Sequence, residues 1–162
     1  PYPGGPQIDR LAKEGNNVYA LAKPKTENPM DFSFSGLKSS VLQFQARCAR
    51  RQENFVPADL ACSFQETALE ALLSRVTYAL DHVSGIRHFV VAGGVAANSR
   101  LRTLITETIA PNYPQIRFTI PPLSCCTDNA AMIAIAGTIA YQHGRRSSFD
   151  IGAQPGMPLE SE

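Results

Sequence analysis

The stretch HFVVAGGVAANSRLR, residues 88–102, joins an apolar strand to a helix through two adjacent glycines. Its phenylalanine and valines are typical of a buried strand, and Asn98 is a favourable N-cap for a helix that we expect at about 98–109. Glycines let a ligand approach the backbone, and a helix start offers unpaired N–H groups. The stretch is neither a Walker A loop nor a GxGxxG motif. It is therefore either a tight strand–helix turn capped by Asn98, or a nucleotide-binding turn in which Asn98 also contacts a purine or sugar.

The segments on both sides of this stretch alternate between helix and strand. Upstream, apolar residues recur every three or four positions and predict a long helix at about 59–83, with Asp59 as its N-cap. Downstream, IRFTIPP (116–122) predicts a second strand, and DNAAMIAIAGTIAYQHG (128–144) predicts a helix that Gly144 ends. Alternation with short connections favours parallel strands covered by helices. The expected fold class is therefore α/β.

The first 58 residues predict smaller elements. Pro6 and Gly15 bound a short helix at about 6–14. The segment 16–24 predicts a strand that Pro24 ends, and a helix is expected after Gly36. With 162 residues, the chain is long enough for one core. We expect one α/β domain over residues 1–144 and a tail over 145–162 that is rich in Gly, Pro and Ser.

Composition excludes some classes of protein. Hydrophobic residues make up 44% and charged residues 18% of the chain, as in a soluble globular protein, and the formal net charge is +1. No apolar run approaches the roughly 18 to 20 residues that span a bilayer. The four cysteines, at positions 48, 62, 125 and 126, form no CxxC pair. We therefore expect a cytoplasmic, reduced protein, with no membrane partner.

Asp9 follows Gly5 by four residues, close to one helical turn. A carboxylate at this position can accept hydrogen bonds from two vicinal hydroxyls, as a ribose offers, while Gly5 leaves room for the sugar. The alternative is a solvated carboxylate on the surface of a helix. Spacing alone favours the solvated carboxylate.

Asp128 lies in SCCTDNAAM, residues 124–132, at the start of the last predicted helix. It is either a helix cap or a hard, anionic metal ligand. One carboxylate does not hold a metal alone, and no pair among the three histidines, at positions 82, 88 and 143, has the HxxxH spacing of a metal site. Cys125 and Cys126 are expected to pack or to face the loop. Spacing alone predicts a cap.

Basic residues gather near two helix ends. RCARR (47–51) contains Arg47, Arg50 and Arg51, and GRR (144–146) adds Arg145 and Arg146. These arginines either contact an RNA backbone or form solvated helix ends, where they favour the helix dipole. In DFSFSGLKSS (31–40), Lys38 lies near a helix start and can hold phosphate or RNA backbone; the alternative is that Ser35 is an ordinary cap there.

Four motifs occur in the order of one known family: YPGGP with Asp9, DFSFSGLK (31–38), VVAGGVAAN (90–98) and PPLSCCTDNAAMIA (121–134). Together they resemble the C-terminal half of the universal tRNA threonylcarbamoyladenosine transferase family, whose bacterial members are called TsaD and were formerly labelled O-sialoglycoprotein endopeptidase. The resemblance runs from Tyr2 to about Gly156. It implies an RNase H-like lobe of the actin/Hsp70/sugar-kinase superfamily.

The resemblance also implies an activity and its site. The family is an acyltransferase that moves a threonylcarbamoyl group from threonylcarbamoyl-AMP to N6 of adenosine 37 in tRNAs that read codons beginning with A. By motif position, Gly5, Asp9 and Asn98 are similar to nucleotide-binding residues, and Asp128 is similar to the carboxylate ligand of one iron or zinc ion. Expected partners are the tRNA, a paralogous actin-like subunit and an ATPase subunit.

The chain departs from the family pattern in one respect. The family's two metal-binding histidines and a substrate-binding Ser-Gly-Gly segment belong to an N-terminal half that is not in these residues, so we expect a C-terminal lobe that is inactive alone. Two alternatives remain: a non-catalytic actin-like paralogue that serves as a scaffold of the same complex, or an actin-fold ATPase. Retention of Asp9, Asn98 and Asp128 argues against the scaffold.

Overall fold

The computed structural model describes residues 3–23 and 26–152. The chain divides into two compact units, Pro1–Cys126 and Thr127–Glu162, which are described separately. Within the described ranges, none of the helices combines the length and apolar character needed to cross a membrane.

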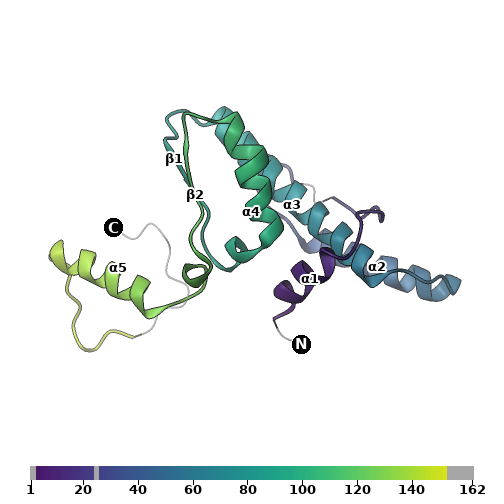
Figure 1. Ribbon diagram of the computed structural model, residues 1–162. Helices are drawn as coiled ribbons and strands as arrows, with labels where there is room; N and C mark the ends of the chain where they lie inside the picture. Colours follow the sequence, from purple (N-terminus) through teal and green to yellow (C-terminus); the bar gives the residue numbers. More distant parts are fainter. Residues whose placement is uncertain (1–2, 24–25, 153–162) are drawn as a thin grey trace. The chain divides into compact units, whose positions relative to one another are not determined.

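The described part of the first unit contains four α-helices and two short strands (Figure 1). In chain order its main elements are α1 (Gly4–Ala12), α2 (Ser35–Arg51), α3 (Pro57–His82), β1 (His88–Val90), α4 (Ser99–Leu104) and β2 (Arg117–Thr119). Shorter pieces are the 3-10 helices η1 (Gly94–Ala97), η3 (Ala110–Asn112) and η4 (Leu123–Cys125), together with the π-helical turn η2 (Ile105–Ile109), which continues α4.

The two strands pair in parallel, as predicted. His88 faces Arg117, Phe89 faces Phe118 and Val90 faces Thr119. The helices α3 and α4 lie on the same side of this sheet (Figure 1), where Phe89 and Phe118 pack against their buried leucines and isoleucines. The α/β class predicted from the alternation of helices and strands is confirmed.

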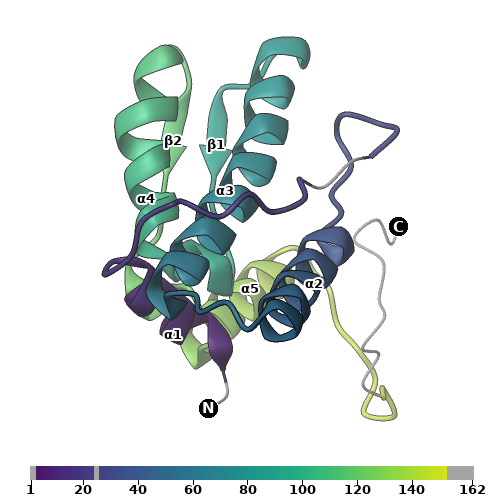
Figure 2. The same cartoon turned by 90° about the vertical axis from the view of Figure 1, so that its right-hand side faces the viewer.

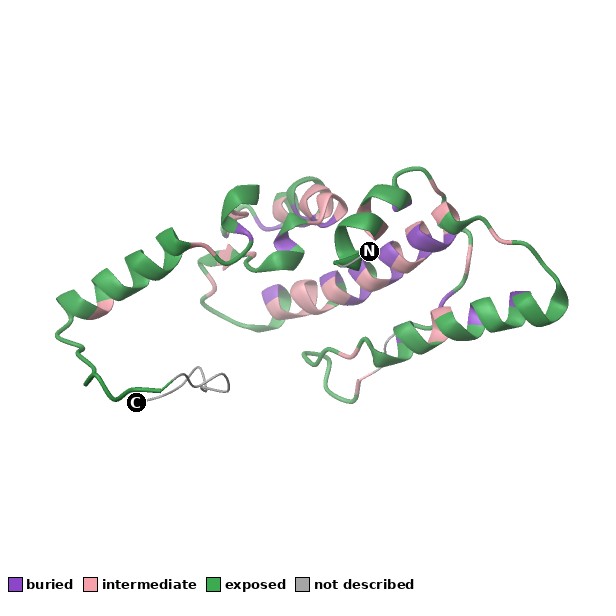
Figure 3. Cartoon of the chain, turned by 90° about the horizontal axis from the view of Figure 1, so that it is seen from below, coloured by how far each residue is buried: buried purple, intermediate pink, exposed green. Residues whose placement is uncertain are grey.

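Two apolar clusters share the helix α3, which was predicted at nearly the observed bounds. The first cluster gathers α3, α4 and the segment before β2, with Leu69, Leu73, Leu80, Leu101, Ile105, Ile109, Tyr113 and Ile116 buried. The second joins α2 and the segment before it to the start of α3, with Leu21, Leu37, Phe44, Cys48 and Leu60 buried. Buried residues therefore follow α3 along its length (Figure 3).

The loop after α1 packs closely on the start of α3. A Cβ added at Gly15 would lie 2.6 Å from the backbone nitrogen of Asp59 and still closer to the carbonyl group of Ala58. The neighbouring Asn16 donates its N–H to the Asp59 carboxylate at 2.7 Å. The prediction that Asp59 is the N-cap of α3 is wrong, because the helix begins two residues earlier, at Pro57, and Asp59 binds the neighbouring loop.

The strand predicted over residues 16–24 is also not formed; residues 16–23 are irregular, and Pro24 lies outside the described residues. Backbone N–H groups there bond to side chains of helices instead of to a strand. Val18 and Tyr19 donate to the hydroxyl of Ser63 at 3.1 and 3.0 Å, and Ala22 donates to Ser40 at 2.9 Å. Figure 2 shows this segment crossing in front of the helices.

The second unit contains α5 (Ala130–Gln142). The chain leaves the helix through Gly144 at φ +77°, in the left-handed region that favours glycine, as predicted. The helix carries no charged side chain, and none of its residues is buried. The expected boundary at residue 144 stays a prediction, and residues 153–162 of the expected tail lie outside the described residues.

Candidate functional site

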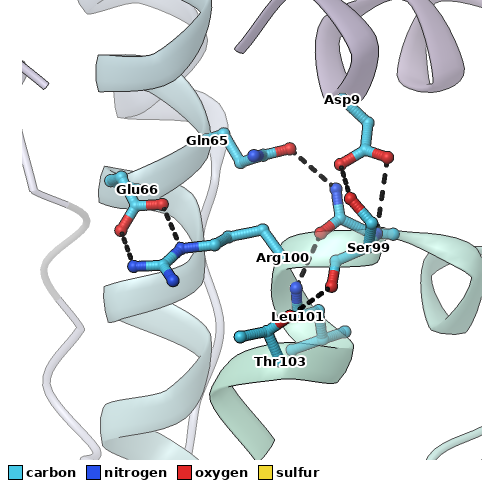
Figure 4. A network of polar contacts seen from close by, with 8 residues as sticks. Asp9, Gln65, Glu66, Ser99, Arg100, Leu101 and Thr103 are labelled. Carbon is cyan, nitrogen blue, oxygen red and sulfur yellow. Dashed lines mark hydrogen bonds and ion pairs between the residues drawn. The ribbon is translucent and has the colours of Figure 1, made fainter. Parts of the chain in front are cut away.

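Asp9 on α1 contacts the start of α4, ninety residues later in the chain. Its carboxylate accepts the Ser99 hydroxyl at 3.0 Å and the Ser99 backbone N–H at 3.4 Å (Figure 4). Lys13, one turn along α1, places its ammonium 3.8 Å from the same carboxylate, whose side chain is only 17% exposed. Asp9 is therefore docked against a helix start, where its charge meets unpaired N–H groups.

Asn98 caps α4, as predicted. Its side-chain oxygen accepts the N–H of Leu101 at 2.8 Å, while its amide nitrogen donates to the side-chain oxygen of Gln65 at 2.8 Å. Gln65 lies on α3 and is buried. Because Asp9 bonds the residue that follows Asn98, the structure brings two of the predicted nucleotide-binding residues together.

A bidentate ion pair between α3 and α4 lies next to these contacts. Arg100 donates from Nε and Nη2 to the two carboxylate oxygens of Glu66 at 2.7 and 3.1 Å (Figure 4). The hydrogen bonds that Arg100 donates to Glu66 raise the pKa of Arg100. Burial, followed by the charge of Glu66, raises the pKa of the nearby Cys62 thiol. The pair therefore fixes α4 to α3.

A groove of about 420 Å³ runs along this junction. Side chains of Lys13, Gln65, Glu66, Ser99 and Arg100 line it, with both charges represented. None of these five side chains was predicted as a site residue, although Ser99 and Arg100 belong to the stretch 88–102. Glu66 and Arg100 are thirty-four residues apart, so no local spacing marks them as partners.

The glycines predicted to face a ligand have open surroundings. Gly93 has φ +82°, a conformation that side-chain-bearing residues rarely adopt, and it leads into η1. A Cβ at Gly93, Gly94 or Gly5 would meet nothing within 4 Å. Gly5 lies in the first turn of α1, the helix that carries Asp9.

Asp128 is not the cap of α5, so that prediction is wrong. Asn129 is the N-cap, and its side-chain oxygen accepts the N–H of Met132 at 3.0 Å. Asn129 has the extended backbone that a cap requires, and Asp128 precedes it by one residue. The Asp128 side chain is exposed and belongs to the second unit.

The described residues do not by themselves fit a metal ion. Across residues 3–23 and 26–152, no three His, Cys, Asp or Glu side chains gather in a possible metal site. His82 and His143 bond backbone carbonyls one turn earlier at 2.8 Å each, and His88 contacts the hydroxyl of Thr119 at 2.7 Å. Within the described residues, Asp128 therefore has no group of metal-binding side chains around it.

The adjacent cysteines differ, and both are free thiols. Cys126 is buried, with its sulfur 3.1 Å from a guanidinium nitrogen of Arg102, and Cys125 is exposed. Arg102 also donates to the carbonyl of Pro121 at 2.6 Å. The expectation of packing therefore holds for Cys126, which helps Arg102 to fix the turn after β2.

Comparison with known proteins gives one consistent family. A model of the family TsaD, described as tRNA N6-adenosine threonylcarbamoyltransferase, matches residues 1–135. Proteins of that name are 44% identical to the chain in Bacillus licheniformis and 46% identical in Bacillus anthracis, each alignment covering 99% of this chain and 47% of the relative. The relative from Geobacillus thermodenitrificans is 46% identical, covering 98% of this chain and 46% of its own length. The chain spans about half the length of the curated relatives that it matches.

Proposed function

The chain belongs to the tRNA N6-adenosine threonylcarbamoyltransferase family, and we propose that it forms the nucleotide-binding C-terminal part of such an enzyme. The proposed reaction transfers the threonylcarbamoyl group of threonylcarbamoyl-AMP to N6 of adenosine 37 in tRNAs that read codons beginning with A. The observation that carries the proposal is the match of the family model over residues 1–135, which includes all four motifs. A tRNA substrate fits a cytoplasmic location.

We assign the adenylate to the surface around Gly5, Asp9 and Asn98. One contact supports this: Asp9 bonds Ser99, the residue that follows Asn98 in the chain. The Asp9 carboxylate already accepts one hydroxyl, so a ribose hydroxyl replaces that of Ser99 without new charge burial. The open backbone at Gly5 and Gly93 leaves space for the sugar and the purine.

The Asn98 side chain already forms two hydrogen bonds within the protein. Both polar ends of its amide are engaged, one as the cap of α4 and one with Gln65. The amide nitrogen has a second N–H, which no hydrogen bond among the described residues uses. A nucleotide can therefore accept this N–H while Asn98 keeps its bonds to Leu101 and Gln65.

Asp128 is proposed as one ligand of an iron or zinc ion whose two histidine ligands come from the N-terminal half of the family's proteins. Its exposed carboxylate has no hydrogen-bond partner within the described residues, so its oxygens are available. Because one carboxylate does not hold a metal, we expect these 162 residues alone to bind neither iron nor zinc stoichiometrically.

The proposal also includes a fold and a set of partners. We propose that the parallel β1–β2 pair with α3 and α4 belongs to the C-terminal RNase H-like lobe of an actin-like enzyme. That lobe works with an N-terminal lobe, with a paralogous actin-like subunit and with an ATPase subunit. The chain alone is then inactive.

The experiment compares two neighbouring substitutions in the complete enzyme. Asp128→Ala removes the proposed metal ligand, whereas Asn129→Ala removes only the cap of α5. Modified adenosine is measured by mass spectrometry of nucleosides from digested tRNA, and bound metal by elemental analysis. We expect Asp128→Ala to lose both modification and metal, and Asn129→Ala to keep metal. Full modification by Asp128→Ala contradicts the assignment.

A second experiment tests whether the reaction requires the N-terminal half. The 162-residue chain is incubated with tRNA and threonylcarbamoyl-AMP, with and without a separately produced N-terminal half. Modification is expected only when both halves are present. Modification by the chain alone contradicts the requirement for the second lobe.

A further inference from the structure

The helix α2 concentrates positive charge in a chain that is nearly neutral. It carries Lys38, Arg47, Arg50 and Arg51 and no carboxylate, whereas the whole chain has a formal net charge of +1. All four cations are exposed. A local basic face of this kind attracts polyanions even when the whole protein is almost uncharged.

One face of α2 borders a polar groove of about 320 Å³. Its lining consists of Ala20, Ser40, Gln43, Phe44, Arg47 and Arg50. The α2 positions 40, 43, 47 and 50 are spaced by three or four residues and therefore lie along one side of the helix. None of the lining residues is acidic.

The side chains of the groove are oriented by contacts that leave donors available. The Arg47 guanidinium lies 5.3 Å from the centre of the Phe44 ring, and Arg50 donates from Nε to the carbonyl of Ala46 at 3.3 Å. Ser40 accepts the N–H of Ala22 at 2.9 Å, so its hydroxyl proton can be donated outwards.

Arg47 and Arg50 also differ from the other arginine at this helix end. Within the described residues neither forms an ion pair, whereas Arg51 lies 3.7 Å from the carboxylate of Glu53. Lys38 lies on the other side of α2, where it lines a separate, mainly apolar groove with Val41 and Leu42. The unneutralised charge therefore faces the polar groove.

We propose that this groove, which we call the α2 groove, binds the sugar–phosphate backbone of the tRNA. The inference rests on the proposed function and adds a docking surface to it. Two guanidinium forks one helical turn apart match phosphate oxygens, while Ser40 and Gln43 supply neutral hydrogen bonds. Contacts of this kind position a nucleic acid without reading its sequence, which suits an enzyme that acts on several tRNAs.

The test measures tRNA binding by the complete enzyme at salt concentrations from roughly 50 to 200 mM. The variant Arg47→Gln with Arg50→Gln removes both forks. The control, Arg87→Gln with Arg117→Gln, removes the same charge from exposed arginines at the sheet. The variant Arg47→Lys with Arg50→Lys keeps the charge of the groove and shows whether loss of the arginines disturbs the fold.

Each lost phosphate contact lowers the slope of log affinity against log salt by about 1. The slope of the double glutamine variant should therefore be smaller than that of the wild type by about 2. Over this salt range the affinity of the wild type should consequently fall by a factor about ten times larger than that of the variant. Its KM for tRNA should rise while kcat stays unchanged. The lysine variant should keep the wild-type slope, and the control should match the wild type.

Three results overturn the inference. The first is an unchanged slope in the double glutamine variant, and the second is an equal loss of slope in the control. The third is unchanged tRNA binding together with lost binding of polyglutamate, which indicates that an acidic protein occupies the groove.

Failure of the proposed function gives a different result. If the wild type binds tRNA through the α2 groove but does not modify it, the groove stands and the reaction is wrong.

Discussion

Substituting Gly15 by alanine should destabilise the protein more than the addition of one methyl group suggests. A Cβ there would lie 2.6 Å from the backbone nitrogen of Asp59, well short of the 3.4 Å at which ordinary contact begins, and the atoms in the way belong to backbone. The side chain cannot rotate away from α3, so the loop after α1 has to move as a whole.

The magnitude follows from what that movement breaks. Overpacking of this kind costs roughly 1 to 3 kcal/mol. The Asn16–Asp59 hydrogen bond is exposed, so its loss adds only about 1 kcal/mol. We expect the free energy of unfolding to fall by about 2 to 4 kcal/mol, a large share of the roughly 5 to 15 kcal/mol of a typical domain.

Urea unfolding followed by far-UV circular dichroism measures this loss. Gly36→Ala is the matched control, because a Cβ there meets nothing within 4 Å and the residue lies in the first turn of α2. It should raise the stability by roughly 0.4 to 1 kcal/mol, because alanine leaves the unfolded chain less conformational freedom than glycine does. Equal stability of Gly15→Ala and the wild type would refute the close packing of this loop on α3.

Three further changes probe other contacts. Tyr113→Phe removes the 2.7 Å bond to Asp81 that raises the pKa of Tyr113, costing about 1 to 2 kcal/mol at neutral pH. The wild type loses that advantage as the pH rises beyond the ordinary tyrosine value of about 10, so urea midpoints of the two proteins should converge in alkali; a constant gap refutes this. Asn129→Ala should destabilise α5 by about 1 kcal/mol in thermal unfolding, whereas Asp128→Ala should not, and equal effects would contradict the capping assignment. Leu101→Ala, at a side chain only 2% exposed, should cost about 2 to 5 kcal/mol in urea unfolding; a loss below about 1 kcal/mol would contradict its place in the core.

The parts of the fold that follow from local signals were predictable. The apolar run before Gly93 and Gly94 gave a strand, and the spacing of apolar residues from Leu60 onwards gave α3. The segment 16–24 has the composition of a strand but no neighbouring strand to pair with among the described residues. Its N–H groups therefore bond to Ser63 and Ser40, a choice that only tertiary packing determines.

The candidate site was predictable in its motifs but not in its contacts. Asp128 and Asn129 are both good caps by residue type, and the backbone angles decide for Asn129. The pair between Glu66 and Arg100 depends on how α3 packs against α4, which no spacing within either helix reveals. The positions of Asp9 and Asn98 came from motif resemblance, and their neighbourhood from the structure.

Sharing α3 between two apolar clusters has a consequence for how the protein opens. The cluster with α2 involves the first half of the helix, and the cluster with α4 extends along its second half. Amide hydrogens of α2 can therefore exchange with solvent through a partial opening that leaves the α4 cluster closed, whereas those in the middle of α3 exchange only when both clusters separate. The slowest-exchanging amides of the molecule should consequently lie near Leu69, where the two clusters meet along α3.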